Sequence, residues 1–218
     1  MTPEQQKFYD IIHTTDYKVV GEDVNYKVFT NDETKEVVLQ FQETASRTDW
    51  INNFDILPWP LRLCDKIVWT TRGYARAYRS AWSQPLSEFI AEALDHPGYK
   101  KVIRGWSLGS AMAKIAARHY VISKAKKQDG DILDELTTYG DVKCWVNPFT
   151  QYDKRISKCH EYGTINDLVT WCVPFFSRDR RCKVGDRFSF EKLLETDYWH
   201  THYHEYDYSK FEDGESNE

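Results

Sequence analysis

The sequence lacks the long apolar runs of a membrane protein. No stretch of about 18 consecutive apolar residues occurs along its 218 residues, although a membrane-spanning helix needs about 20. The first residues, MTPEQQK, are polar and lack the apolar segment of a secretory signal peptide. We therefore expect a soluble, cytoplasmic protein.

Cysteine and surplus positive charge are also scarce. The five cysteines are odd in number and include no C-x-x-C pair, so neither a disulfide framework nor a zinc knuckle is indicated, and we expect reduced thiols. The chain has 29 Lys and Arg against 34 Asp and Glu. We therefore expect no nucleic-acid partner and no binding to strongly anionic surfaces.

Aromatic side chains, in contrast, are abundant. The chain has 8 Trp, 14 Tyr and 11 Phe within an apolar share of 41%, a composition typical of a packed globular protein with aromatic pocket or surface walls. Its length suits one α/β domain rather than two large ones. We predict a single domain over residues 1–206 and an acidic, disordered tail over 207–218.

Residues 101–120 predict a strand, a sharp turn and a helix in succession. The strand leads directly into G-x-S-x-G, whose fixed positions are Gly105, Ser107 and Gly109. Apolar residues then recur at helical spacing, at Leu108, Ala111, Met112, Ile115, His119 and Ile122. The charged residues of this helix are assigned to its solvated side: Lys114, Arg118 and Lys124.

This turn has the chemistry of a nucleophile site. A serine between a strand and a helix needs neighbours without side-chain bulk, and the two glycines meet that need. The helix N-terminus directs N–H groups and a positive dipole end at charge developing beside the Ser107 hydroxyl. Ser107 is therefore the candidate nucleophile. The alternative is a chance match, because the pattern fixes only three positions.

The remaining pattern predicts an α/β fold. Antiparallel strands open the chain, and alternating strands and helices later indicate a mostly parallel central sheet flanked by helices. Strands are predicted at 17–20, 25–30, 36–42, 66–70, 136–140, 156–162 and 187–190, and a hairpin turn at 31–34. Helices are predicted at 3–13 and 74–94, the second split by Pro85, and the charged run 178–183 is predicted as a solvated loop.

The segment 47–60 is unusually apolar. It holds six large apolar side chains from Asp49 to Pro60, which on a surface would need a partner. It is therefore either a lid over an apolar pocket or a core element.

A serine nucleophile also needs an imidazole base and a carboxylate, in the chain order Ser, Asp, His for this turn. Asp167 and the cluster His200, His202 and His204 follow Ser107 in that order. His160, Asp141 and Asp153 are competitors. The cluster also allows a metal site, but successive same-face strand positions lie about 6.5 Å apart, which disfavours one shared tetrahedral ion.

Several blocks together resemble the class 3 (fungal-type) lipases, a family of α/β hydrolases, over residues 15–204. The blocks, in chain order, are Val37–Thr44, Asp49-Trp50-Ile51, Arg72-Gly73-Tyr74, Gly105–Gly109, Thr138-Tyr139-Gly140, Asn166–Val169 with Pro174, and His200–Tyr203. They are similar to the family's F-R-G-[ST], D-W, H-x-G-F, G-H-S-L-G, T-F-G, N-x-D-x-V-x-x-x-P and H-x-x-Y motifs.

The resemblance implies a serine esterase or lipase with an α/β-hydrolase fold, no cofactor and no metal. It implies Ser107 as nucleophile, Asp167 as orienting acid and His200 as base, with His202 the close alternative. It implies an oxyanion hole from Leu108 and Thr44, a lid at 47–57, and a lipid or other acyl-ester substrate. The segment 47–60 would make transient contact with a lipid interface.

This chain departs from the family pattern at four positions. Gln42 and Glu43 replace Arg and Gly beside the oxyanion donor, Trp106 replaces His, and Ser110 replaces Gly. A carboxylate at Glu43 would oppose negative charge developing there, so a catalytically inactive binding module is an alternative. A metal-dependent hydrolase, and a phospholipase or thioesterase with the same triad, are further alternatives.

Overall fold

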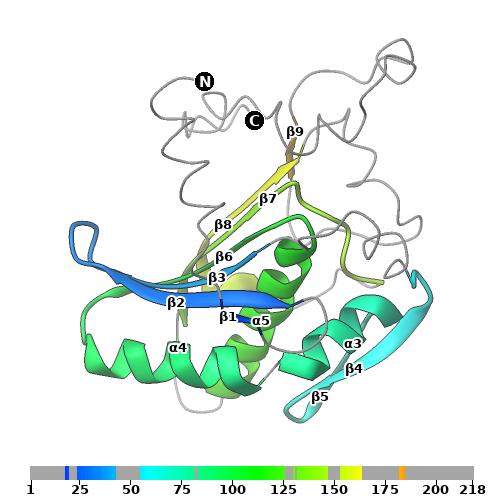
Figure 1. Ribbon diagram of the computed structural model, residues 1–218, viewed down its shortest axis with the longest axis horizontal. Helices are drawn as coiled ribbons and strands as arrows, with labels where there is room; N and C mark the ends of the chain where they lie inside the picture. The colour runs from blue at the N-terminus through cyan, green and yellow to red at the C-terminus, as the bar shows by residue number, and fades with distance from the viewer. Residues whose placement is uncertain are drawn as a thin grey trace.

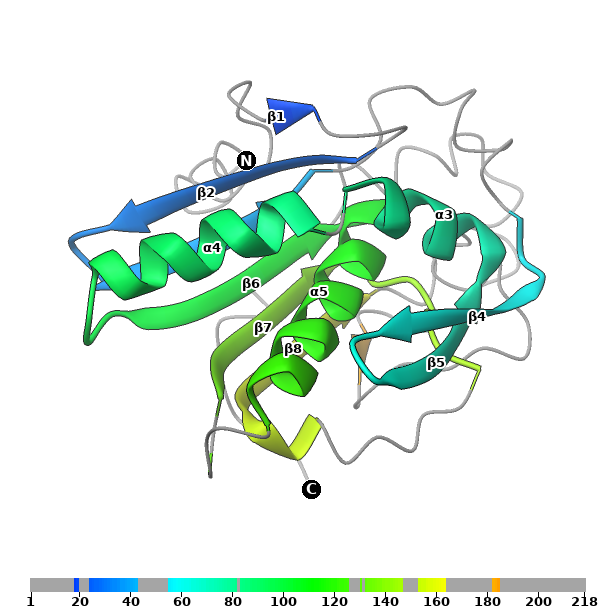
Figure 2. The same cartoon turned by 90° about the horizontal axis from the view of Figure 1, so that it is seen from below.

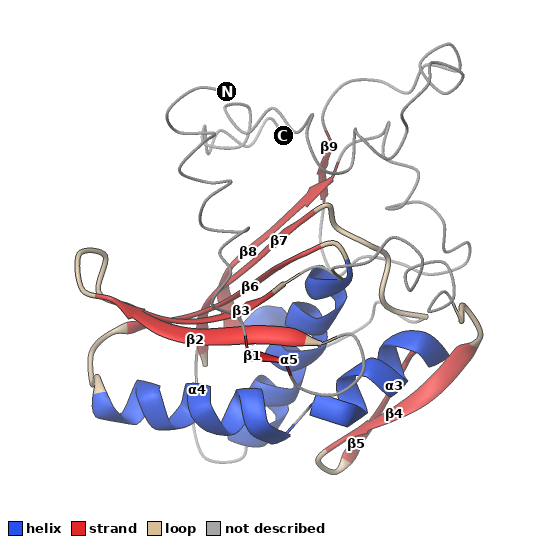
Figure 3. Ribbon diagram, viewed as in Figure 1, coloured by secondary structure: helices blue, strands red, loops and turns tan. Residues whose placement is uncertain are grey.

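The computed structural model describes residues 18–19, 24–42, 55–81, 83–125, 130, 132–146, 153–163 and 182–184. Within them, one sheet has the strand order β1-β2-β3-β6-β7-β8-β9, and β4 and β5 form a separate hairpin (Figure 1). The strands are β1 (Lys18–Val19), β2 (Asn25–Asn31), β3 (Glu36–Phe41), β4 (Pro58–Leu63), β5 (Lys66–Thr71), β6 (Lys100–Trp106), β7 (Leu133–Tyr139), β8 (Ile156–Gly163) and β9 (Cys182–Val184). The helices are α3 (Arg72–Ala81), α4 (Ser83–Asp95), α5 (Leu108–Lys124) and the 3-10 helix η1 (Asp153–Arg155) (Figure 3).

Strand directions confirm the predicted sheet. β1, β2 and β3 pair antiparallel at the N-terminal edge, whereas β3, β6, β7, β8 and β9 are parallel. The central strands carry short apolar runs that are buried, Val37–Leu39 in β3 and Val102–Ile103 in β6, as a parallel sheet requires. The predicted hairpin turn is also present: the Asn31 side-chain oxygen accepts the N–H groups of Glu33 and Thr34 at 3.0 and 3.2 Å.

The α-helices of the described residues, α3, α4 and α5, lie on one face of the sheet (Figure 2). α4 packs against β2 and β3, and α5 packs against β6, β7 and β3. α3 lies between α5 and the β4–β5 hairpin. Because α5 is enclosed by the sheet and by α3, every residue from Leu108 to Ile122 is buried.

Some predicted boundaries are wrong. Pro85 does not mark the break in the 74–94 helix, because α3 ends at Ala81 and Pro85 is the third residue of α4, where a missing N–H removes no helical hydrogen bond. Residues 58–60 begin β4, and residues 47–54 of the predicted lid lie outside the described residues. The run 178–183 is not wholly a loop, since Cys182 begins β9. The predicted 3–13 helix, the 187–190 strand and the 207–218 tail lie outside the described residues.

Among the helices that the structure describes, none combines the length and the apolar character that crossing a bilayer demands.

Candidate functional site

Ser107 stands alone between a strand and a helix. β6 ends at Trp106 and α5 begins at Leu108, so Ser107 forms the turn, with φ 54° and ψ −121°. These angles lie in the left-handed half of the Ramachandran plot, which side-chain-bearing residues seldom adopt. Ser107 is fully buried, and its hydroxyl has no hydrogen-bond partner among the described residues.

Two glycines allow this turn to pack closely. A Cβ atom at Gly109 would lie 2.6 Å from the carbonyl oxygen of Phe41 and 2.7 Å from that of Gln42. A Cβ atom at Gly105 would overlap the carbonyl of Gly109. Both distances at Gly109 are shorter than a carbon and an oxygen tolerate, so the end of β3 meets the start of α5 because residue 109 is glycine. The end of β6 meets the same helix because residue 105 is glycine. The predicted reason for the G-x-S-x-G spacing is thereby confirmed.

Backbone hydrogen bonds hold the turn against the neighbouring strand. The Ser107 N–H donates to the Tyr139 carbonyl at the end of β7 at 3.0 Å, and the Ser110 N–H donates to the Ser107 carbonyl at 2.8 Å. Leu108 is the first residue of α5, so its N–H is one of the amides that no carbonyl of the same helix satisfies. The positive end of the helix dipole therefore lies beside Ser107.

The other predicted site residues, Thr44, Asp167, His200 and His202, lie outside the described residues. The structure does describe the strands that precede two of them in sequence, β3 before Thr44 and β8 before Asp167. β3 ends at Phe41, opposite Gly105, and β8 ends at Gly163. Both strands are parallel to the sheet strands around β6, so their carboxyl ends lie at the edge that carries Ser107.

The competing residues are placed less favourably. Asp153 belongs to η1, directly before β8, and therefore lies at the amino edge, opposite Ser107. His160 lies within β8 and stacks on Tyr162, with centroids 5.8 Å apart. The Asp141 carboxylate is fully buried and already accepts hydrogen bonds from Lys114 and Thr138. The backbone therefore places Asp153 and His160 away from the turn, and the Asp141 carboxylate is already engaged.

The prediction of a solvated side on α5 is wrong for Lys114 and Arg118, whereas Lys124, the last residue of α5, is partly exposed. Lys114 and Arg118 are 1% and 3% exposed. Lys114 lies in a buried charge cluster, and the Arg118 guanidinium lies 3.6 Å from the centre of the Trp145 ring. Helical periodicity alone assigns charged side chains to the solvent-exposed side of a helix. These two are buried because their partners, Asp141 and Trp145, lie far from them in sequence. The one available signal is that residues 108–123 contain no other Lys, Arg, Asp or Glu, which favours a helix buried all round.

A second polar contact lies further along α5. His119 is buried, and its Nδ1 lies 3.0 Å from the hydroxyl of buried Tyr78 on α3. Burial lowers the pKa of His119 to about 4 and raises that of Tyr78, because desolvation penalises the charged form of each. The contact therefore joins a neutral phenol to a neutral imidazole, and the imidazole tautomer sets which of the two donates.

Comparison with known proteins gives one family and one fold. The family model described as Lipase (class 3) matches residues 38–176. No curated protein sequence matches the chain. The chain is similar to a Rhizomucor miehei triacylglyceride lipase structure, with 21% identity over 76% of this chain and 65% of that one and a TM-score of 0.60.

Two further solved structures agree. A Rhizomucor miehei lipase propeptide complex has 20% identity over 70% of this chain and 48% of that one, with a TM-score of 0.60. A triacylglycerol lipase from Penicillium expansum has 19% identity over 71% and 61%, with a TM-score of 0.57. The chain therefore spans less than two thirds of each of these three lipases, and the likeness establishes the α/β-hydrolase fold.

Proposed function

The chain belongs to the class 3 lipase family, and from that premise we propose that it hydrolyses carboxylic esters, in particular lipid esters, with Ser107 as nucleophile. The observation that carries the proposal is the backbone of Ser107, held at φ 54° between β6 and α5. A non-glycine residue keeps such a conformation only where its surroundings impose it. The result is a hydroxyl at the N-terminus of a buried helix, where negative charge is stabilised.

The reaction would proceed through an acyl-enzyme. The Ser107 Oγ attacks the acyl carbonyl while an imidazole, proposed to be that of His200 with His202 as alternative, takes the hydroxyl proton. The tetrahedral intermediate then expels the alcohol, which receives that proton. Water, deprotonated by the same imidazole, then attacks the acyl carbonyl. The second tetrahedral intermediate breaks the acyl–Ser107 bond, the imidazole returns its proton to the Ser107 Oγ, and the acid is released. Asp167 would hold the imidazole tautomer.

Two groups are proposed to bind the oxyanion. The Leu108 N–H lies at the start of α5. Thr44 follows the end of β3 in sequence, and at that end the Gln42 carbonyl lies close to the backbone of Gly109. Donors fixed in advance stabilise the charge that develops in the transition state without reorganising. The sheet topology supports the roles proposed for Thr44 and Asp167, because β3 and β8, the strands that precede them, both end at the edge of the sheet that carries Ser107.

Two observations favour a second candidate function. Ser107 is fully buried, and Glu43 adjoins the proposed oxyanion donor in sequence. Both features are compatible with a binding module that retains the scaffold without catalysis. A phospholipase or thioesterase would use the same residues on another acyl group.

Covalent labelling separates these functions. The wild-type protein should react with a fluorophosphonate probe at Ser107, located by mass spectrometry, and should hydrolyse triolein or short p-nitrophenyl esters. Ser107→Ala should lose labelling and lower turnover by about 10³-fold or more. Ser123→Ala is the matched control, because Ser123 lies near the other end of α5 and bonds only the local Tyr120 carbonyl at 2.7 Å in the described structure.

Two outcomes would contradict ester hydrolysis by Ser107. An unlabelled wild type without esterase activity would support the binding module. Activity retained in Ser107→Ala but lost with a chelator would support the metal-dependent alternative at His200, His202 and His204.

A further inference from the structure

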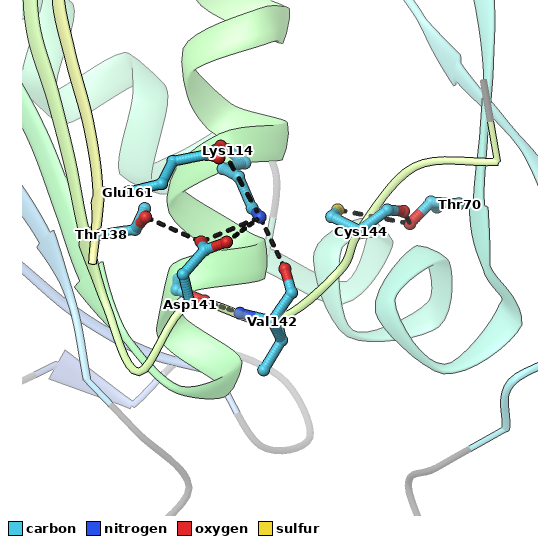
Figure 4. Close-up of polar contacts among 8 residues, drawn as sticks. Thr70, Lys114, Thr138, Asp141, Val142, Cys144 and Glu161 are labelled. Carbon is cyan, nitrogen blue, oxygen red and sulfur yellow. Dashed lines mark hydrogen bonds and ion pairs between the residues drawn. The ribbon is translucent and has the colours of Figure 1, made fainter. Parts of the chain in front are cut away.

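Three ionisable side chains from α5, β8 and the segment after β7 meet in the interior of the protein (Figure 4). The Lys114 Nζ lies 2.9 and 3.1 Å from the two carboxylate oxygens of Asp141 and 3.9 Å from that of Glu161. All three side chains have no solvent exposure. Lys114 also donates to the Val142 carbonyl at 2.6 Å, and Thr138 donates to Asp141 at 2.7 Å.

A buried ion-pair cluster of this kind contributes little net free energy to folding. Removing charges from water costs free energy that their mutual attraction often fails to recover, and apolar residues of similar volume usually serve as well. Where a buried pair is retained, fixing one geometry among several is its best-supported role. The Lys114–Asp141 pair is therefore expected to fix the relative position of the elements that it joins.

The pair holds a short bridge, residues 139–142, that touches both sides of the site. At one end, the Tyr139 carbonyl accepts the Ser107 N–H at 3.0 Å. At the other, the Asp141 N–H donates to the Tyr162 carbonyl of β8 at 3.0 Å, one residue before that strand ends. The Val142 N–H donates to the Ser110 hydroxyl on the first turn of α5 at 3.2 Å.

We propose that the Lys114–Asp141 ion pair is a positioning element for the ester hydrolysis proposed above, on which this inference rests. It locks residues 139–142 between the Ser107 turn and the carboxyl end of β8, after which the chain continues toward Asp167. Neither side chain touches substrate. Because misplacing a reacting group by about 1 Å can cost about 10²-fold in rate, loosening the bridge lowers turnover without weakening substrate binding.

Asp141→Asn tests the pair with little change of shape. The amide keeps an oxygen for Thr138 but removes the charge that faces Lys114. We expect kcat per folded molecule to fall about 10- to 100-fold, KM to change less than about threefold, and fluorophosphonate labelling of Ser107 to slow in parallel. Folded fractions come from near-UV circular dichroism and urea unfolding.

Ser110→Ala provides an independent test, because it removes the acceptor of the Val142 N–H and leaves the charges in place. It should also lower kcat, and the double variant should be no more than about threefold slower than the slower single one, since both act on one element. If Asp141→Asn fails to fold, Ser110→Ala alone decides.

Thr70→Val is the matched control. The Thr70 hydroxyl donates to the Cys144 carbonyl at 2.8 Å, so this variant removes a buried hydrogen bond from the same segment outside the bridge. It should lower stability and keep kcat within about threefold.

Each outcome decides the inference. A folded Asp141→Asn or Ser110→Ala variant with wild-type kcat would overturn it, as would an equal loss in Thr70→Val, which would reveal only general destabilisation. In both cases a labelled, active wild type keeps the proposed function intact. A wild type that is neither labelled nor active removes the proposed function, and the positioning role with it.

Discussion

At the scale of single residues, the backbone of Ser107 stores strain that glycine would not. Non-glycine residues at such angles cost about 1–3 kcal/mol, and Ser107 has φ 54° and ψ −121°. Ser107→Gly would relieve this cost but give the unfolded chain more freedom, worth about 0.4–1 kcal/mol. We expect Ser107→Gly to be about 1 kcal/mol more stable than Ser107→Ala, with activity absent from both. Urea denaturation measures the difference.

Ser107→Ala is the appropriate reference, because it removes the hydroxyl and keeps the Cβ atom that causes the strain. A Ser107→Gly variant less stable than Ser107→Ala would show that the turn is relaxed. The surrounding contacts would then not be needed to hold the Ser107 backbone in this conformation.

The turn was predictable from sequence, because its requirements are local. Gly105, Ser107 and Gly109 fall within five consecutive positions, and the strand and helix beside them have their own periodicity. The burial of Lys114 was not predictable in the same way. Its partners Asp141 and Glu161 lie on other elements, and helical periodicity contains no information about them.

At the scale of elements, α3 and α5 are joined by a contact that responds to pH. The pKa of His119 is about 4 in the fold and about 6.5 in an unfolded chain. Between these values the unfolded state binds the proton and the folded state does not, so stability is retained above pH 6.5 and lost as pH falls toward 4. The loss attributable to His119 should reach about 2 kcal/mol at pH 4.5.

Urea denaturation at pH 7.5 and pH 4.5 measures this loss. His119→Gln keeps an amide that can donate to or accept from the Tyr78 hydroxyl and removes the titration, so it should lose about 2 kcal/mol less than the wild type over that interval. His96→Gln, at a partly exposed position after α4, is the control. An identical pH dependence in wild type and His119→Gln would mean that the imidazole is not held neutral by the fold.

Elements were predicted better than their limits. The strands at 25–30, 36–42 and 66–70 are present almost as expected, because alternation and turn residues mark them. β4 was missed, since Pro58 and Pro60 argue against a strand by propensity. Among the described strands, β4 pairs only with β5, and a strand with one paired edge tolerates proline.

At the scale of the whole molecule, the β4–β5 hairpin presents an apolar face to solvent. Leu61, Leu63 and Val68 are buried beneath it, whereas Ile67 and Trp69 on the other face are 65% and 49% exposed. Ile56 and Leu57, which directly precede β4 in the segment predicted to contact lipid, are also exposed, at 39% and 53%. The hairpin also adjoins the segment after β7, through the Val146 N–H and the Trp69 carbonyl at 3.1 Å.

We expect this face to contact the lipid interface, because a contiguous exposed apolar patch usually marks an interaction site. Ile67→Ser combined with Trp69→Ser should lower turnover of emulsified triolein about tenfold, since each side chain contributes about 1.5–3 kcal/mol when fully buried and less at an interface. Turnover of a soluble p-nitrophenyl ester should stay within about twofold. Leu94→Ser is the control, because Leu94 is 73% exposed near the end of α4, at the amino edge of the sheet. Equal losses on both substrates would place the effect in folding or chemistry, and unchanged triolein turnover would remove the hairpin from the interface.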